Sequence, residues 1–593
     1  MSQPQRQTLN IQPGLYTLET DVDSISRWKD GDKIRFYRGM PQKLGGWQKN
    51  GSQTFLGKAR TAIDWLSLRF EKFIALGTHL KLYVWNGGDF SDITPLRSTD
   101  ALTDPFTTTN GSTTVSVEHV AHGALDGDYV TYSGATAVGG VTIDGEYQLT
   151  YVDDDHYTIT HSAAAGSSAT GGGSVSAEYQ VHVGRERTMV YRGWGAGPWS
   201  GGTWGTPRSV TNFLTMARIW SLSNWGEDLI ACYRNGGIYL WDSSAGTGTR
   251  AATISGAPST AVSVFVSEEN RQLVVLGAHD GSNDDPMLIR WSASEDYSDF
   301  TPTDLNTAGR KRLDKGNELY GRVGVKNGNL IFSDAWIWLM TFDGPPYTFG
   351  FLPLGDSGGI RSPNAMKELG GNAYWMGKQD FFIYDGGSPR VLPCDVLNHV
   401  FDDFNQDQSA LVFAGANRAF GEIWWLYPSA NSNECDRYVA YSTVENHWTF
   451  GTLGRTVYVA DSKIFANSYA LGTDGYLYDH DFGVDDDGAG MEVHLESGDI
   501  MLSPGGEDMM HLSGAIPNFK RLTGEISLVL KGRREAQDPD QFSTPAQTIT
   551  SSTKKVSPRM RARQIAVRIE SSGVGDDFRM GRWRVLIQPD GKK

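Results

Sequence analysis

The segment EIWWLY (residues 422–427) is a short apolar run that ends on an aromatic residue and lies between a glycine and a proline. Short apolar runs bounded by turn-forming residues are typical of buried β-strands. Similar runs follow one another along the chain: LKLYVW (80–85), GGIYLW (236–241), RQLVVLG (271–277), DAWIWLMTF (334–342) and QDFFIYDGG (379–387). Helical periodicity is confined to 363–369 and 395–404, where Asp395 is placed to cap the start. The sequence therefore predicts an all-β fold.

The aromatic residues that end these runs recur at a nearly regular distance. From Trp241 onward the landmarks are separated by 50, 51, 42, 57 and 37 residues, at Trp291, Phe342, Tyr384, Tyr441 and Tyr478. A four-stranded propeller blade needs roughly 40–50 residues. The preceding landmark, Trp85, lies 156 residues before Trp241, which is room for two blades once an inserted segment is removed. We predict a β-propeller of six or seven blades over roughly residues 55–485.

One segment between the first two landmarks differs from its surroundings. Residues 104–178 are rich in Thr, Ser and Gly and contain no Trp, and apolar residues alternate with polar ones at 115–117 and 147–151. A period of two predicts half-buried strands. We expect a small inserted β-barrel or sandwich that is closed by a flexible GSSATGGGS linker (166–174).

The chain changes character again after about residue 490. Segments such as EISLVLKGRR (525–534), RARQIAVRIESS (561–572) and GRWRVLIQ (581–588) alternate cationic with apolar residues, which predicts strands with one packed and one cationic face. We expect a C-terminal β-sandwich or platform. The predicted organisation is an N-terminal segment for propeller closure or platform (1–54), the first part of the propeller (55–103), the inserted module (104–178), the rest of the propeller (179–489) and the basic C-terminal β element (490–593).

Composition and charge exclude several classes of protein. With 70 Gly among 593 residues and 11% aromatic residues, the chain is neither disordered nor collagen-like. A net charge of −16 argues against a protein that grips nucleic acid through its phosphates. Residues 519–593 contain 16 Lys and Arg against 8 Asp and Glu, so the preceding 518 residues carry −24. The three cysteines are too few for a disulfide framework, and we expect neither a leader peptide nor a membrane span.

Motifs of catalysis occur without the context that they need. GDSGG (355–359) matches the nucleophile segment of serine proteases, but Ser357 would need a histidine base and an acid, so we expect a glycine-rich turn. The acidic runs at 153–155, 284–285 and 485–487 lack the spacing of a calcium loop. Nucleotide-binding motifs, zinc spacings and a sialidase-type S-x-D-x-G-x-x-W box are absent from the sequence. We therefore expect no enzymatic activity, no cofactor and no metal.

One stretch near the end of the predicted propeller resembles a known blade pattern. Residues 441–449, YSTVENHWT, have the Y-x(4)-N-x-W spacing of kelch-like blades. By that resemblance, Trp448 packs between blades and Asn446 turns the chain.

The N-terminal segment RWKDGDKIRFYRGMPQKLGGW (27–47) places a strand between two glycine turns and brackets it with Trp28 and Trp47. An edge strand that caps the propeller is one interpretation. The run W-x-D-G-D-x-I-R-F-x-x-G-x-P-x-K-x-G-G-W also resembles the opening of a group of structural proteins from short-tailed, podovirus-type bacteriophages. The stretches IRWSAS (289–294), DFTP (299–302) and GKQDFFIYDG (377–386) are similar to the same group.

The resemblance implies a tail nozzle or hub component, a group also described as packaged-DNA stabilisation or head-completion proteins. Such a chain would form a ring in the virion tail, with a hexamer expected, below the portal and its adaptor. It would be assembled in the host cytoplasm, close the DNA exit channel and support tail fibres or spikes. Genomic DNA would pass through without specific binding, which an acidic wall favours because it repels phosphates.

Two other classes remain open. A propeller can host a carbohydrate-active enzyme or lectin at a phage tail tip, if carboxylates or arginines converge in one pocket. A general interaction scaffold is the third class. The candidate structural and interface residues are Trp28, Arg35, Trp47, Trp291, Trp448, Arg561, Arg563 and Arg582.

Overall fold

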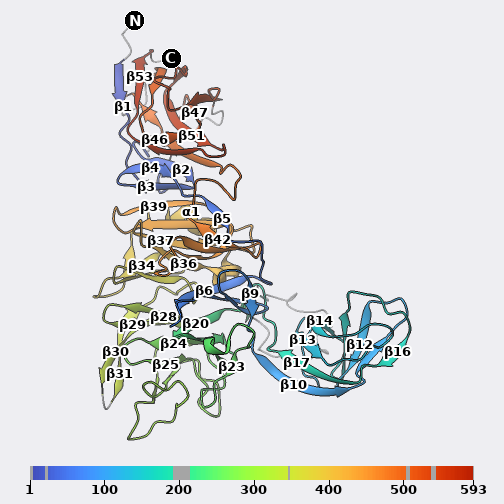
Figure 1. Ribbon diagram of the computed structural model, residues 1–593. Coiled ribbons are helices and arrows are strands. Elements are labelled where there is room, and N and C mark those ends of the chain that lie inside the picture. Colours follow the sequence, from blue (N-terminus) through green and yellow to red (C-terminus); the bar gives the residue numbers. More distant parts are fainter. Residues whose placement is uncertain are drawn as a thin grey trace, which may run out of the picture. The chain divides into compact units, whose positions relative to one another are not determined.

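A computed structural model of the chain describes residues 5–20, 24–190, 214–344, 347–502, 508–535 and 542–591. The described part is built of β-strands, and its helical elements are α1 (Leu397–Asp402) and the short 3-10 turns at Ser243–Ala245 and Gln406–Leu411. The predicted all-β class is confirmed (Figure 1). No helix in these ranges is long and apolar enough to cross a membrane.

In the described residues, seven four-stranded sheets have the blade pattern of a propeller, and in six of them all four strands follow sequence order. The chain divides into two compact units, one of residues 53–319 and 343–348 and the other of residues 1–52, 320–342 and 349–593. The first of these units holds three such sheets: β6 (Ala59–Leu66), β7 (Lys72–Thr78), β8 (Leu82–Trp85) and β9 (Phe90–Asp92); β20 (Trp220–Trp225), β21 (Asp228–Tyr233), β22 (Ile238–Trp241) and β23 (Ala252–Thr253); β24 (Ser263–Ser267), β25 (Gln272–Leu276), β26 (Leu288–Trp291) and β27 (Gly309–Arg312).

The other unit holds nearly all of the remaining four. These are β28 (Leu319–Val325), β29 (Gly328–Ser333), β30 (Trp336–Gly344) and β31 (Thr348–Asp356); β32 (Met366–Leu369), β33 (Asn372–Met376), β34 (Phe381–Tyr384) and β35 (Arg390–Leu392); β36 (Phe413–Asn417), β37 (Glu422–Tyr427), β38 (Arg437–Ser442) and β39 (His447–Thr452); and β40 (Arg455–Val459), β41 (Ser468–Gly472) and β42 (Leu477–His480). The seventh sheet takes its fourth strand, β5 (Trp47–Lys49), from the N-terminal segment, with Trp47 opposite His480. The prediction of six or seven blades is thus confirmed, with seven sheets of this kind.

The inserted module is one eight-stranded sheet, in the order β10-β17-β13-β14-β15-β12-β11-β16. Its strands, in cyan tones in Figure 1, enclose a core of their own that includes Phe106, Tyr132, Tyr157 and Tyr179. The strands are β10 (Leu96–Thr103), β11 (Phe106–Thr108), β12 (Thr114–Glu118), β13 (Tyr129–Ser133), β14 (Gly145–Tyr151), β15 (His156–Thr160), β16 (Ala169–Gly171) and β17 (Ser174–Gln180).

Two expectations about this module are corrected. The sheet begins at Leu96, before the expected start at 104, because β10 pairs with β17. The glycine-rich stretch 166–174 is no flexible linker, because it contains β16, which pairs with β11. Gly172 is required by close packing instead, because a side chain there, where φ is +121°, would collide with the ring of Phe106.

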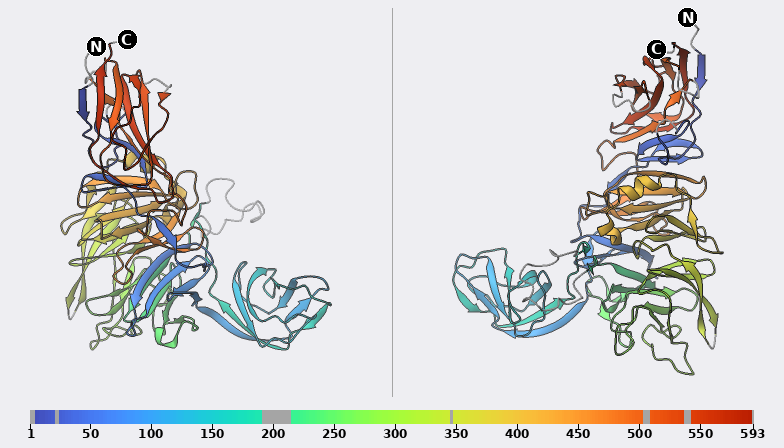
Figure 2. Two further views of the ribbon diagram at one scale, coloured as in Figure 1. Left: turned by 45° about the horizontal axis from the view of Figure 1, so that its top comes forward. Right: turned by 180° about the vertical axis from the view of Figure 1, so that it is seen from behind.

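Strands from both ends of the chain together build three further sheets (Figure 2). We call these three sheets the terminal β element. The first sheet contains β1 (Gln5–Thr8), β53 (Arg584–Pro589), β45 (Met510–Ile516) and β50 (Met560–Ala562). The second contains β2 (Trp28–Asp32), β43 (Val493–Ser497), β44 (Ile500–Met501), β51 (Gln564–Ser571), β47 (Ile526–Arg533), β48 (Phe542–Ser543) and β49 (Gln547–Ile549). The third contains β3 (Ile34–Tyr37), β4 (Met40–Lys43), β52 (Asp577–Met580) and β46 (Phe519–Thr523).

The two helix candidates have different outcomes. Residues 363–369 form a turn and strand β32, because pairing of Met366 with Trp375 overrides the local helical spacing. The stretch 395–404 contains α1, but its N-cap is Val396 and no side chain caps it. Asp395 instead forms an ion pair of 3.2 Å with Arg27.

A two-stranded sheet of β18 (Met189–Val190) and β19 (Leu214–Thr215) completes the set. Cys232, Cys394 and Cys435 are free.

Candidate functional site

The residues of the N-terminal motif lie at the base of the terminal β element. Strand β2 pairs with β43, and β3 pairs with β4 around a tight turn at Gly39, whose φ is +70°. Gly45 has no room for a side chain, because a Cβ there would lie 2.7 Å from the Cα of Asp481. The motif therefore occupies the place where the terminal β element meets the sixth and seventh blade-type sheets.

Arg35 in β3 is the buried centre of this junction. Its Nε donates to Oε1 of Glu422 at 2.9 Å, and its Nη1 donates to Oδ1 of Asp481 at 2.8 Å. The guanidinium also lies 3.7 Å from the centre of the Phe420 ring. Glu422 begins β37, and Asp481 follows β42, so one side chain ties three parts of the chain together.

The opposite charges in this cluster keep one another ionised. Burial alone would lower the pKa of Arg35, but Glu422 and Asp481 outweigh burial and raise it. Burial alone would raise the pKa of Asp481, but the attraction of Arg35 keeps it below the ordinary value. Each carboxylate has a second partner, since Asn417 donates to Asp481 at 3.0 Å and the Trp424 indole donates to Glu422 at 2.9 Å. We call Arg35 with its two carboxylate partners, Glu422 and Asp481, the Arg35 clasp.

The candidate tryptophans are buried at strand contacts. The Trp47 indole donates to Asp486 and stacks on His480 with ring centres 5.2 Å apart. The Trp291 indole donates to the Thr307 carbonyl at 2.9 Å. The rings of Trp448 and of Phe381 in the preceding sheet have their centres 4.7 Å apart. The turn before Trp448 is made by Asn446, whose φ is +54°.

The three candidate arginines of the terminal β element differ in their surroundings. Arg561 forms an ion pair of 2.6 Å with Asp590, and Arg563 forms one with Glu535. Arg582 is exposed and lines a cavity. Alternating charge alone did not reveal the acidic partners of Arg561 and Arg563, which lie 29 and 28 residues away in sequence.

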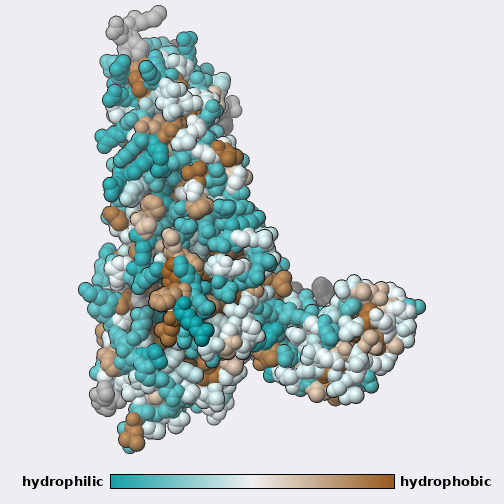
Figure 3. All heavy atoms as spheres, in the orientation of Figure 1, coloured by the Kyte–Doolittle hydropathy of each residue, from teal (hydrophilic) through white to brown (hydrophobic). Residues whose placement is uncertain are grey.

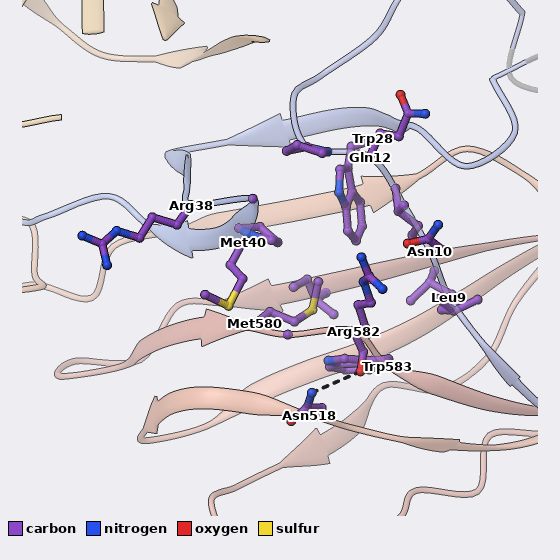
Figure 4. Close-up of a pocket in the computed structure, with 17 residues that line it drawn as sticks. Leu9, Asn10, Gln12, Trp28, Arg38, Met40, Asn518, Met580, Arg582 and Trp583 are labelled. Carbon is purple, nitrogen blue, oxygen red and sulfur yellow. Dashed lines mark hydrogen bonds between the residues drawn. The ribbon is translucent and has the colours of Figure 1, made fainter. Parts of the chain in front are cut away.

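That cavity, of about 700 Å³, brings Trp28 and Arg582 together (Figure 4). Trp28 and Arg582 point toward one another between the N-terminal segment and the C-terminal strands, and Asn518 donates to the Arg582 carbonyl at 3.3 Å. Apolar walls come from Leu9, Met40, Met580 and Trp583. An apolar group that carries a negative charge would suit this lining.

A second cavity, of about 420 Å³, is strongly polar. It is lined by Tyr16, Glu19, Lys29, Asp30, His399, Phe450, Glu496 and Lys531, among others. Glu496 is paired with Lys29 at 3.1 Å, with Lys531 at 2.6 Å and with Arg568 at 2.9 Å. Burial would raise the pKa of Glu496, but these cations hold it below the ordinary value.

Sequence reasoning missed this second cavity, because its residues come from positions 16 to 531. Arg568 bridges the carboxylates of Glu496 and Asp30 in this cavity, since its Nη1 lies 2.9 Å from Glu496 and 3.5 Å from Asp30. The only sequence signal was the cationic alternation that includes Lys531 and Arg568.

The remaining sequence motifs take part in turns and in hydrogen bonds to neighbouring segments. Ser357 is buried in a glycine turn, where its hydroxyl accepts from the Gly359 amide at 3.2 Å. The acidic run 485–487 hydrogen-bonds to neighbouring segments: Asp485 accepts from the Gly575 amide at 2.7 Å, and Asp487 accepts from the Lys49 amide at 3.0 Å. Within the described ranges, no group of three or more His, Cys, Asp or Glu side chains has the arrangement of a metal site.

Comparisons with known proteins give structural likenesses at low sequence identity. No protein-family model matches the sequence, and no curated protein sequence matches it. Phage phi92 endosialidase is 10% identical, with 80% of this chain and 74% of that chain covered and a TM-score of 0.19. Trypanosoma rangeli sialidase is 10% identical, with 64% and 93% covered and a TM-score of 0.27. Exo-β-1,3-galactanase from Phanerochaete chrysosporium is 9% identical, with 68% and 100% covered and a TM-score of 0.19.

These three proteins are glycosidases by name, and one of them is a phage protein. The expectation that this chain has no enzymatic activity is corrected by this finding. At these TM-scores the likeness assigns no substrate, active site or assembly to the chain.

Proposed function

We propose that the chain is a structural subunit of a bacteriophage tail nozzle ring, which forms the DNA exit channel below the adaptor and supports tail appendages. The observation that carries the proposal is the place of the N-terminal motif. The motif by which the chain resembles podovirus tail proteins supplies Arg35 to a buried clasp and Trp47 to the seventh sheet.

A ring subunit in this position must stay intact while the genome passes through. The Arg35 clasp ties the terminal β element to the sixth and seventh sheets by charge-assisted hydrogen bonds, which are among the stronger noncovalent contacts in a protein. Burial protects these bonds from screening by salt. This firm junction supports a load-transmitting role better than a hinged one.

Charge supports the same proposal. The first 518 residues carry −24, and an acidic channel wall repels phosphates, so that DNA slides instead of binding. We expect the channel wall to be lined mainly by Asp, Glu and neutral polar side chains. A lumen dominated by Arg and Lys in a reconstruction of the ring would contradict this expectation.

Electron microscopy and mass photometry of the purified chain test the proposal. We expect closed rings, most simply of six copies of the 65.1 kDa chain, and immunogold labelling at the tail of intact virions. A chain that stays monomeric over the accessible concentration range, and whose antibodies do not label tails, would rule the nozzle out.

A carbohydrate-active protein of a phage tail tip is the second candidate. The polar cavity favours it, because Asp30 and Glu496 share one arginine there and glycosidases act through two neighbouring carboxyl groups. Release of reducing ends from purified host surface polysaccharide would support this candidate, and Glu496→Gln should then abolish the release. An unchanged rate in Glu496→Gln would exclude the polar cavity as the site.

A further inference from the structure

The inserted module is strongly acidic, and its one arginine, Arg97 in β10, donates to the His122 carbonyl at 3.0 Å. From Ser98 to Gly184 the sequence contains eleven Asp and Glu and neither Lys nor Arg. The module has a core of its own, and most of these carboxylates lie on its surface, although Asp128 is buried and Glu146 is paired with Lys81. Two copies of the module repel each other, which disfavours a symmetric contact between modules.

Two loops at one end of the module hold each other rigidly. The His119 amide donates to the Asp155 carbonyl at 2.9 Å, and the Ala121 amide donates to the Asp155 side chain at 2.8 Å. The Tyr151 amide donates to Asp126 at 3.0 Å. The loops 119–128 and 151–156 therefore present a surface that is ordered before any partner binds.

This loop surface is unusually apolar for an exposed one. Val120 is 70% exposed, Leu125 55%, Val152 56% and Tyr151 40%. Figure 3 shows hydrophobic residues reaching the surface of the module among mostly neutral ones. Clustered exposed apolar side chains mark interaction sites in soluble proteins. We call these four residues, with the carboxylates of Glu118, Asp126, Asp153 and Asp154 around them, the loop patch.

The terminal β element has a complementary face. Along β53, Arg584 and Leu586 point to one side of the sheet, and Leu586 lies opposite Arg6 of β1. Arg561 of β50 lies opposite His511, which lies opposite Gln588 on the same side of β53. Arg6, Arg561 and Arg584 are exposed and Leu586 is half-buried, and Arg561 is paired with Asp590 at 2.6 Å, so Arg6 and Arg584 carry the charge of this face. We call this surface the arginine face.

We propose that the loop patch of one copy docks on the arginine face of the next copy in the ring. The contact joins an acidic surface with exposed apolar side chains to a cationic surface that holds the half-buried Leu586, so that the charges of the two surfaces match. It also joins two different surfaces, as a closed ring of more than two copies requires. This inference rests on the proposed ring, and it names the interface.

Assembly of the full-length chain tests the interface. We expect Val120→Ser with Val152→Ser, and separately Arg6→Glu with Arg584→Glu, each to raise the concentration at half-assembly in mass photometry by at least about tenfold. Two matched controls should leave it unchanged: Leu305→Ser with Val444→Ser, which are 98% and 73% exposed elsewhere, and Arg69→Glu with Lys463→Glu. Near-ultraviolet circular dichroism of every variant reports whether it is folded.

The outcomes separate this inference from the proposed function. Rings that form at the wild-type concentration in both test variants would overturn the interface and leave the nozzle proposal standing. A wild-type chain that never assembles would overturn both. Loss of assembly in the test pairs alone, with folded variants and intact controls, supports the interface.

Discussion

The guanidinium of Arg35 donates to the carboxylate of Glu422 at 2.9 Å, although 387 residues separate the two in sequence. Their side chains are 2% and 7% exposed. A contact of such long range fixes the N-terminal segment against the sixth sheet, and the first prediction follows from it.

Replacement of Arg35 by Met should lower the free energy of unfolding by about 3–5 kcal/mol, because it leaves Glu422 and Asp481 without their buried cation. Urea unfolding followed by tryptophan fluorescence measures the change. Arg38→Met, at an exposed position three residues later, is the matched control and should cost less than about 0.5 kcal/mol. Equal losses in the two variants would contradict the clasp.

Acid should weaken both the Arg35 clasp and the terminal β element, because each contains a carboxylate paired with cations. The pKa values of Asp481 and Glu496 are below the ordinary values of 3.8 and 4.5, because their cations outweigh burial. As pH falls, these two carboxylates are protonated at a higher pH in the unfolded chain than in the folded protein. Their contribution to the free energy of unfolding is therefore complete above about pH 5 and is lost as pH falls below the ordinary values toward the lowered pKa values of the folded protein.

Unfolding by urea at a series of pH values between 6 and 3 checks this. Asp481→Asn should be less stable than wild type at pH 6, and the difference should shrink toward pH 3. Asp304→Asn, an exposed replacement, should follow the wild-type curve. A constant difference for Asp481→Asn would show that the carboxylate charge is irrelevant.

A buried histidine should add a second pH dependence at higher pH. His480 accepts a hydrogen bond from Arg455 Nε at 3.0 Å, and burial, helped by Arg455, holds its pKa well below 6.5. In the unfolded chain the imidazole takes up a proton near pH 6.5, so folding loses up to about 1.4 kcal/mol per pH unit below that value.

His480→Asn should remove this part of the slope of stability against pH between 7 and 5. His511→Asn, at a half-buried position, is the control. Thermal unfolding at fixed pH steps measures both, and identical slopes in wild type and His480→Asn would contradict the assignment.

Trp47→Ala should loosen the seventh sheet by about 3–5 kcal/mol, since it removes a buried aromatic side chain and its hydrogen bond to Asp486. Hydrogen exchange should become faster in β5 and β42, which pair with each other. Gln48→Ala, at the exposed neighbouring position, should leave exchange unchanged. Faster exchange spread evenly over all sheets would instead indicate global destabilisation.

Most of the blade strands could be predicted from the sequence because they are decided locally, whereas β32 and β5 are set by pairing. EIWWLY is β37 with the predicted bounds, and all six residues are buried. The terminal β element could be predicted only in part. Alternation in residues 525–534 indicated β47, but nothing local indicates that Asp30 lies opposite Glu496.

The candidate site shows the same limit. Arg35 was singled out from its motif, yet its two acidic partners are set by tertiary structure. The glycines at 166–174 indicate flexibility from sequence alone, but the structure shows that Gly172 is required by close packing against Phe106. Local composition cannot distinguish these two uses of glycine.

The position of β5 in the seventh sheet has a consequence for biosynthesis. Trp47 and its partner Asp486 are 439 residues apart, so β5 leaves the ribosome long before the strand that it pairs with. At roughly 5–20 residues per second, β5 waits about 20–90 seconds before its partner strand β42 has been synthesised. A chain that ends early leaves these strand edges open, so that incomplete products are exposed to chaperones and proteases.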